Sequence, residues 1–192
     1  MEVCSLTDTT DLSQRNDHMD KVKLEELRHE LLTRMCGELT EDDFDARLKP
    51  QVSEEQPEVL TVRFDEIGLD SNDALGEFFF RPLAGSGDLV QHFTAALTLT
   101  DGLSGEYLAD VYEAVSYINY TLPCGCFAVD HAHRHLSYRL SMPMSVDMDA
   151  QELYRQINII SGNAVEIAGN YMDILLGLSR GEFDLKSFTE SL

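Results

Sequence analysis

The sequence predicts an α+β fold in which a five-stranded antiparallel sheet is packed with three helices. Five segments alternate apolar and polar residues with the period of two that is typical of strands. Three longer segments repeat apolar residues every three or four positions, as amphipathic helices do. The links between neighbouring strand segments are short, which favours antiparallel pairing. The expected order is helix, three strands, helix, two strands, helix.

The chain has 192 residues, which is enough for one domain with its own core. Residues 1–18 are polar and show no periodicity, so we expect a disordered tail there. Residues 19–181 are expected to form a single domain that contains an acidic linker at 40–57. Residues 182–192 are expected to form a C-terminal tail.

The first helix is expected to begin near Met19 and to end at Gly37, a residue type that often follows the last turn of a helix. Its apolar residues share one face. They are Val22, Leu24, Leu27, Leu31, Leu32 and Met35.

Three strands are expected next, at residues 59–64, 76–81 and 89–100. Apolar residues occupy every second position on one face of each strand, which predicts a sheet with one covered and one wetter face. Val59 and Phe79 are apolar residues on the second face. We expect them to face a partner protein, or to be covered by a dimer mate or a helix.

The second helix is expected at 107–119, with Ser104 as its N-cap. One apolar stripe on this helix faces the core, and four tyrosines lie outside that stripe. They are Tyr107, Tyr112, Tyr117 and Tyr120. A helix that is apolar on more than one face usually buries more than one face. Tyrosine suits an interface because its ring buries area while its hydroxyl finds a partner, so we expect a two-fold contact between two copies of the chain.

A hairpin of strands at 124–130 and 135–141 should follow, with a turn at Ala132–His133 that sets Phe127 opposite Tyr138. The final helix should begin near Asp147 or Asp149 and end at Gly181. Two glycines inside this helix, Gly162 and Gly169, lie one heptad apart. Because glycine lowers helix propensity, we expect close backbone packing or a bend at these positions.

Several stretches resemble the YbjN-like family of bacterial sensory transduction regulators, which is related to the class I type III secretion chaperones. They are a helix ending in Ile118-Asn119-Tyr120, a Leu-Pro-x-Gly-x-Phe-x-Val-Asp segment at 122–130, a Leu-Ser-Tyr-Arg strand at 136–139, and a long final helix that ends at a glycine. The element order also resembles that of the chaperones. The resemblance implies a secretion chaperone-like fold and a homodimer without catalytic activity that binds a segment of a partner protein.

The formal net charge is −21, from 35 acidic and 14 basic residues. Such a charge argues against binding to nucleic acid, which requires a basic surface, and against an anionic membrane surface. No apolar run of about 18 residues predicts a membrane span, and the first residues do not resemble a signal peptide. We therefore expect a cytoplasmic protein whose four cysteines are reduced thiols.

No motif predicts catalysis or a cofactor. The segment Gly85-Ser86-Gly87 lacks the pattern of a nucleophile elbow and the lysine of a phosphate-binding loop. The sequence is therefore interpreted as that of a protein-binding module and not of an enzyme.

The alternative function is a metal- or thiol-dependent sensor that uses the hairpin. Thiolate and imidazole together suit zinc, and five such side chains are close in sequence. They are Cys124, Cys126, His131, His133 and His135. The expected register, however, places Cys126 opposite Arg139, four residues from His135, and four strand residues span about 13 Å. That separation is too long for shared coordination, so a polar turn with two small thiols is the favoured interpretation.

Overall fold

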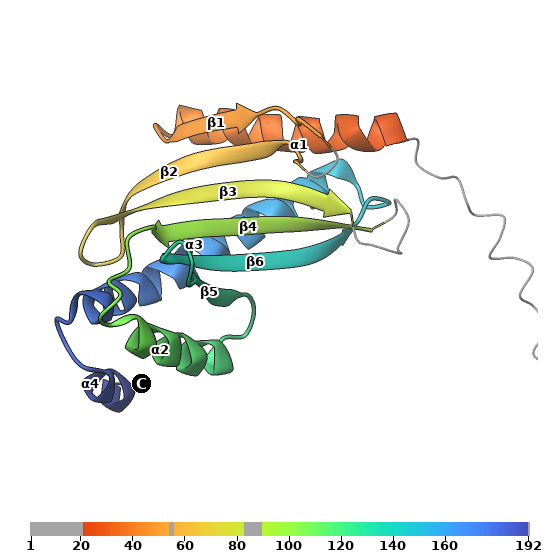
Figure 1. Cartoon of the computed structure of the whole chain (residues 1–192). Helices are drawn as coiled ribbons and strands as arrows, with labels where there is room; N and C mark the ends of the chain where they lie inside the picture. The colour runs from red at the N-terminus through yellow and green to blue at the C-terminus, as the bar shows by residue number, and fades with distance from the viewer. Residues whose placement is uncertain (1–20, 54–55, 83–89, 192) are drawn as a thin grey trace, which may run out of the picture.

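A computed structural model describes residues 21–53, 56–82 and 90–191. The described chain forms six strands and four helices (Figure 1). In order they are α1 (Lys21–Glu41), β1 (Asp45–Lys49), β2 (Val59–Ile67), β3 (Asn72–Pro82), β4 (Val90–Thr100), α2 (Leu108–Thr121), β5 (Cys126–Asp130), β6 (His135–Ser145), α3 (Ala150–Arg180) and α4 (Leu185–Ser191). The tail predicted at 1–18 and the segment Gly85-Ser86-Gly87 lie outside the described residues.

The strands form one sheet in the order β1-β2-β3-β4-β6-β5, and every neighbouring pair is antiparallel. The α+β class and the antiparallel pairing are confirmed, but the prediction of five strands is wrong because the sheet has six. The additional strand, β1, lies inside the segment 40–57 that was predicted as a linker. Only Ala46 and Leu48 of β1 are partly buried, and its other residues are charged and exposed. Short charged strands are typical of sheet edges, and they carry little apolar signal.

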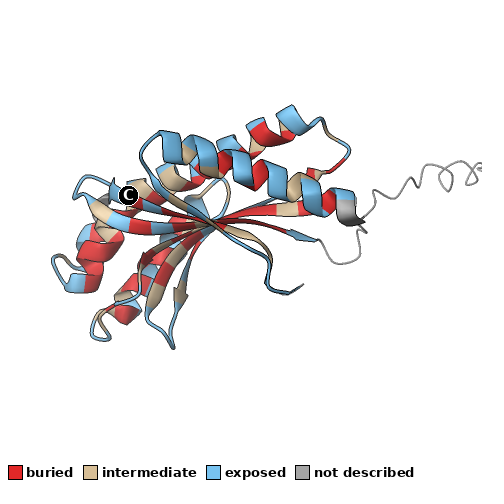
Figure 2. Cartoon of the chain, turned by 90° about the horizontal axis from the view of Figure 1, so that it is seen from above, coloured by how far each residue is buried: buried red, intermediate tan, exposed pale blue. Residues whose placement is uncertain are grey.

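The helices α1 and α3 pack on the same face of the sheet, and α2 lies beside the edge strand β5 (Figure 1). Large apolar side chains fill the space between sheet and helices. The fully buried ones include Phe78, Phe93, Leu97, Tyr138 and Ile157. On the opposite face, residues such as Arg63, Arg81 and Arg139 are exposed. Figure 2 shows this alternation of buried and exposed residues along the strands.

The ends of α3 agree with the predicted signals. The Asp149 carboxylate accepts hydrogen bonds from the backbone N–H groups of Gln151 and Glu152, at 2.9 and 3.4 Å. Gly181 is the C-cap and has a left-handed backbone with φ of 72°. Both caps satisfy backbone groups that have no partner inside the helix.

Two other predicted helix ends are wrong. Gly37 lies inside α1, which continues to Glu41 because Leu39 of this added turn still packs against the core. Ser104 is not the cap of α2. Its hydroxyl accepts from the N–H of Glu106 at 3.3 Å, ahead of the helix, while the N-cap position is occupied by Tyr107 without a side-chain cap.

The C-terminal segment 182–192 contains α4, where only a tail was expected. Asp184 accepts a hydrogen bond from the N–H of Ser187 at 2.8 Å and so caps the short helix. Phe188 is 1% exposed and belongs to the core. A helix of seven residues with one buried phenylalanine is too short to give a clear periodic pattern.

The hairpin has the predicted register, with Phe127 opposite Tyr138 and Cys126 opposite Arg139. The strand β5 begins at Cys126, two residues later than predicted, because Gly125 adopts a left-handed backbone with φ of 68°. At this point the chain passes so close to the Tyr138 ring that a Cβ on Gly125 would overlap it. The Tyr138 hydroxyl donates to the Cys124 carbonyl at 3.0 Å.

The side chain of Asn119, on the last turns of α2, pairs with the backbone of the edge strand β5. Its amide nitrogen donates to the Phe127 carbonyl at 2.9 Å, and its oxygen accepts from the Phe127 N–H at 2.8 Å. One side chain thus satisfies both backbone groups that an edge residue leaves unpaired. Asn119 lies within one of the stretches on which the family resemblance depends. The two hydrogen bonds to Phe127 give that position a structural role.

Candidate functional site

The four predicted interface tyrosines have different environments. Tyr107 is partly buried and packs against Gly181 at the end of α3, where a Cβ would overlap its ring. Tyr112, Tyr117 and Tyr120 are 39%, 46% and 92% exposed. The Tyr112 hydroxyl also reaches the Val129 carbonyl at 3.4 Å. The exposed part of the predicted surface therefore consists of Tyr112, Tyr117 and Tyr120, which we call the tyrosine face.

Val59 and Phe79 are paired neighbours on the face of the sheet that points away from α1 and α3. Val59 is partly buried, and Phe79 is only 7% exposed. The guanidinium of Arg81 lies 5.0 Å from the centre of the Phe79 ring. Phe79 therefore offers little apolar surface to a partner.

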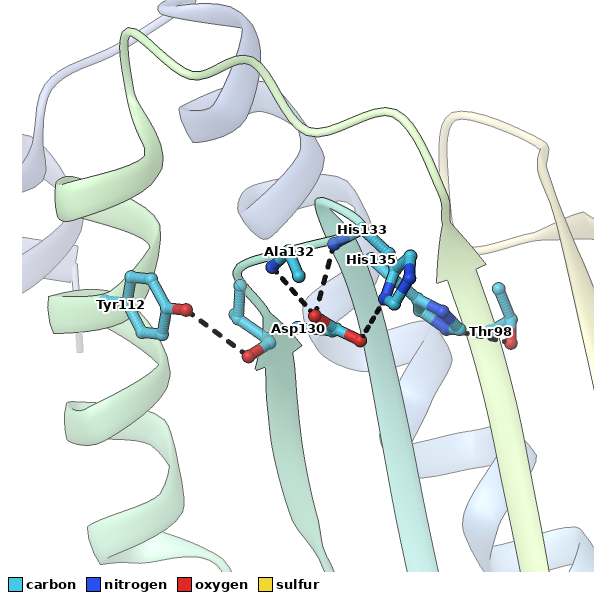
Figure 3. Close-up of polar contacts among 7 residues, drawn as sticks. Thr98, Tyr112, Asp130, Ala132, His133 and His135 are labelled. Carbon is cyan, nitrogen blue, oxygen red and sulfur yellow. Dashed lines mark hydrogen bonds and ion pairs between the residues drawn. The ribbon is translucent and has the colours of Figure 1, made fainter.

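Two of the hairpin histidines, His133 and His135, contact different neighbours (Figure 3). The third, His131, has its ring centre 6.3 Å from that of Tyr112. The Asp130 carboxylate accepts from the N–H groups of Ala132 and His133 and contacts the His133 Nδ1 at 2.7 Å. His135 contacts the Thr98 hydroxyl at 3.1 Å, across to β4. No cluster of three potential metal ligands occurs in the described part of the chain. The contacts of Asp130 and His133 are those of a polar turn.

The Asp130–His133 pair gives a testable pH dependence. The hydrogen bond and the charge of Asp130 raise the pKa of His133 above its ordinary 6.5. Because the folded-state pKa is raised, the contribution of this pair to stability is fully present below pH 6.5 and is lost as the pH rises through the folded-state pKa. We expect an NMR titration to give His133 a pKa above 6.5, and the variant Asp130→Asn, which keeps an acceptor for the turn, to lower it. An unchanged His133 pKa in that variant would contradict the assignment.

The described cysteines Cys36, Cys124 and Cys126 are free thiols. Cys124 is partly buried and Cys126 is exposed. Although the hairpin strand was expected to begin at Cys124, this residue precedes β5, and the left-handed Gly125 lies between the two thiols. This geometry gives no support to a paired-thiol sensor.

On the outside of α1, His29 contacts both Thr33 of the same helix and Glu58, which precedes β2. The Nδ1 of His29 contacts Glu58 at 2.8 Å, and its Nε2 lies 3.5 Å from the Thr33 hydroxyl. The His29 side chain is 63% exposed. His29 thus connects α1 to the segment that precedes β2.

A groove runs along α3, and we call it the α3 groove. Two hollows of 460 and 720 Å³ form it, and they share Phe64, Val165 and Glu166 in their walls. One wall is α3. The opposite wall is made by the end of α1, Phe44 and the end of β2. Apolar side chains form most of its floor, among them Met35, Leu39, Phe64, Phe78, Val165 and Ile174.

The charged residues that line the α3 groove are all acidic within the described part of the chain. They are Glu38, Asp42, Asp65, Glu66, Glu166 and Asp173. Three of them have partners, since Glu38 pairs with Arg34, Asp65 pairs with Arg63, and Asp173 accepts from the Asn72 amide. The other three are exposed and form no ion pair with a described residue. The groove therefore combines an apolar floor with a negative rim.

Tyr154 marks one end of the α3 groove with a buried hydroxyl that has no hydrogen-bond partner among the described residues. The residue is 4% exposed, and the Arg34 guanidinium stacks 3.7 Å above its ring. Burial and the nearby Glu38 raise the pKa of Tyr154 to about 12, so the hydroxyl is protonated at neutral pH. Glu38 and Asn158 both lie close enough to interact with this hydroxyl, although neither makes a hydrogen bond of good geometry with it.

No sequence pattern predicts the α3 groove, but the two glycines inside the final helix, Gly162 and Gly169, both lie in its wall. The expectation of close packing holds at Gly169, where a Cβ would lie 3.1 Å from Cγ2 of Ile67. At Gly162, in contrast, a Cβ would meet nothing within 4 Å, so of the two alternatives close packing does not apply there. The sequence signal at this surface is a glycine in the interior of a long helix, where it lowers helix propensity. Its exposure and the open space beside it are seen only in the structure.

The chain matches no protein-family model and no curated protein. Within the described residues, none of the helices has the length and apolar character needed to cross a bilayer.

Proposed function

We propose that the protein is a non-enzymatic module that binds a segment of a partner protein and acts as a homodimer. The α3 groove is the observation that carries this proposal. Its lining on α3 extends from Tyr154 to Ile174, which corresponds to about 30 Å of helix at 1.5 Å per residue. An elongated apolar groove suits an amphipathic chain segment. The family resemblance, which implies a chaperone-like dimer that holds a protein segment, points in the same direction.

Calorimetry with an uncharged amphipathic peptide tests the binding function. The peptide has about 20 residues, with leucines at helical spacing and glutamines elsewhere, so that it matches the groove in length. We expect one peptide to bind per protomer with a negative heat-capacity change, because apolar surface is removed from water. The absence of saturable binding up to about 1 mM would contradict the proposed function.

The tyrosine face supports the dimer. Three aromatic residues exposed on one helix leave apolar area in water that a second copy could cover around a two-fold axis. A stable dimer needs about 800 Å² per partner. Glu113 is exposed one turn before Tyr117, and the large negative charge of the chain opposes pairing, so moderate salt should favour the dimer.

Light scattering at micromolar concentration in moderate salt measures the oligomeric state. We expect about twice the monomer mass of 21.6 kDa. The variant Tyr117→Asp should give the monomer mass with an unchanged circular dichroism spectrum, because it places a charge in the contact without removing a core residue. Ile159→Asp is the matched control, since Ile159 is 47% exposed on α3 and lies outside the tyrosine face. A monomeric wild type would contradict the dimer.

A further inference from the structure

We infer that the α3 groove selects a basic amphipathic helix of its partner, with an apolar face on the groove floor and lysine or arginine side chains along the rim. The inference rests on the proposed function and specifies the chemistry of the bound segment. It is carried by the charge of the rim and by the shape of the groove walls.

Charge complementarity determines the sign of the charge that the bound segment should carry. The lining residues include carboxylates on both long walls, with Glu38, Asp42 and Glu66 on one side and Glu166 on α3 on the other. A helix between these walls would place its flanking side chains next to them. Basic flanks would gain from both walls, whereas acidic flanks would be repelled by both.

The walls favour a helix over an extended strand. An added strand needs a regular row of free backbone groups at a sheet edge. The groove wall on β2 lacks this, because its register with β3 shifts between Phe64 and Ile67 and Glu66 has a left-handed backbone with φ of 62°. A bulge of this kind interrupts an edge. Gly162, in contrast, leaves space on α3 into which a side chain of a docked helix fits.

The two occupants available from the chain itself have the wrong charge. Residues 1–20 contain five acidic residues and one arginine. A second copy brings a net charge of −21. Neither matches the acidic rim, so the favoured occupant is a basic segment of another protein.

The test compares peptides of one design, with leucines at helical spacing and with lysine, glutamine or glutamate at all other positions. Binding is measured by fluorescence anisotropy at physiological ionic strength, where distant charges are screened beyond about 8 Å. We expect the lysine peptide to bind more tightly than the glutamine peptide by roughly tenfold and the glutamate peptide not to bind.

Matched variants locate the peptide in the groove. Gly162→Trp should weaken binding by roughly thirtyfold or more by filling the groove, whereas Asn163→Trp, at the next and equally exposed position outside the lining, should not. Glu166→Lys should weaken the binding of the lysine peptide by roughly three- to tenfold. Glu30→Lys makes the same change in net charge on the exposed side of α1 and should have less than about a twofold effect. Circular dichroism checks that each variant is folded.

Each remaining outcome overturns the inference in a distinct way. If the glutamine peptide binds as tightly as the lysine peptide and remains sensitive to Gly162→Trp, the groove binds segments without selecting charge, and the proposed function stands. If no peptide responds to Gly162→Trp, the proposed function fails as well. If a peptide of residues 1–20 displaced the lysine peptide, the natural occupant of the groove would be that segment of the chain. If the lysine peptide dissociated the dimer, the natural occupant would be a second copy of the chain.

Discussion

The variant Gly125→Ala should lose about 2–5 kcal/mol of the free energy of unfolding, which is a large part of a typical total of 5–15 kcal/mol. Gly125 has φ of 68°, a conformation that costs a residue with a Cβ about 1–2 kcal/mol. The new methyl group would also overlap the buried Tyr138 ring and lie 2.9 Å from the Arg139 carbonyl oxygen. Crowding of this kind in a packed core adds about 1–3 kcal/mol. Urea denaturation measures the loss.

A second glycine substitution is the control for the first, because it should have the opposite sign. Gly162 lies inside α3, and a Cβ there would meet nothing within 4 Å. Gly162→Ala should therefore raise the free energy of unfolding by up to about 1 kcal/mol through helix propensity alone. If the stability lost in Gly125→Ala were smaller than the stability gained in Gly162→Ala, the described path of the chain between α2 and β5 would be wrong.

Asn119→Ala should lower the free energy of unfolding by about 2–4 kcal/mol, since it leaves the N–H and C=O of Phe127 without partners. Phe127 is 2% exposed, so water compensates little. Asn163→Ala removes an exposed asparagine from α3 and should change the free energy of unfolding by less than about 0.5 kcal/mol relative to the wild type. An equal effect of the two alanine variants would show that the Asn119 side chain does not hold β5.

The variant Asn119→Asp distinguishes the contributions of the two hydrogen bonds between Asn119 and Phe127. The carboxylate of this variant still accepts from the Phe127 N–H but faces the Phe127 carbonyl without a proton to donate. We expect a loss of about 1–3 kcal/mol at neutral pH. The loss should become smaller below about pH 4, where a protonated carboxyl can donate again.

Local patterns predicted the parts of the fold that depend on neighbours in sequence. The cap at Asp149, the stop at Gly181 and the pairing of Phe127 with Tyr138 follow from short-range geometry, and the structure contains all three. β1 and α4 were missed because each is short and has few apolar residues. Their burial depends on distant segments, which periodicity does not show.

The candidate site was less predictable because burial within a chain and burial between chains leave the same sequence pattern. Tyr107 resembled an interface residue but packs on Gly181 of its own chain. The α3 groove arises where α1 and α3, more than a hundred residues apart, lie against one sheet. Rim residues such as Asp42 and Glu166 look in the sequence like ordinary solvated charges, and only the fold places them along one groove.

Methyl NMR of the chain during titration with the lysine peptide tests the central claim most directly. Three reporters line the α3 groove, namely Met35, Ile67 and Ile174. Met142 and Ile159 are 41% and 47% exposed and lie outside its lining. The groove predicts saturable shifts at Met35, Ile67 and Ile174, with Met142 and Ile159 unchanged. Shifts confined to Met142 and Ile159, or binding that leaves Met35 unchanged, would contradict the assignment of the groove as the site for a partner segment.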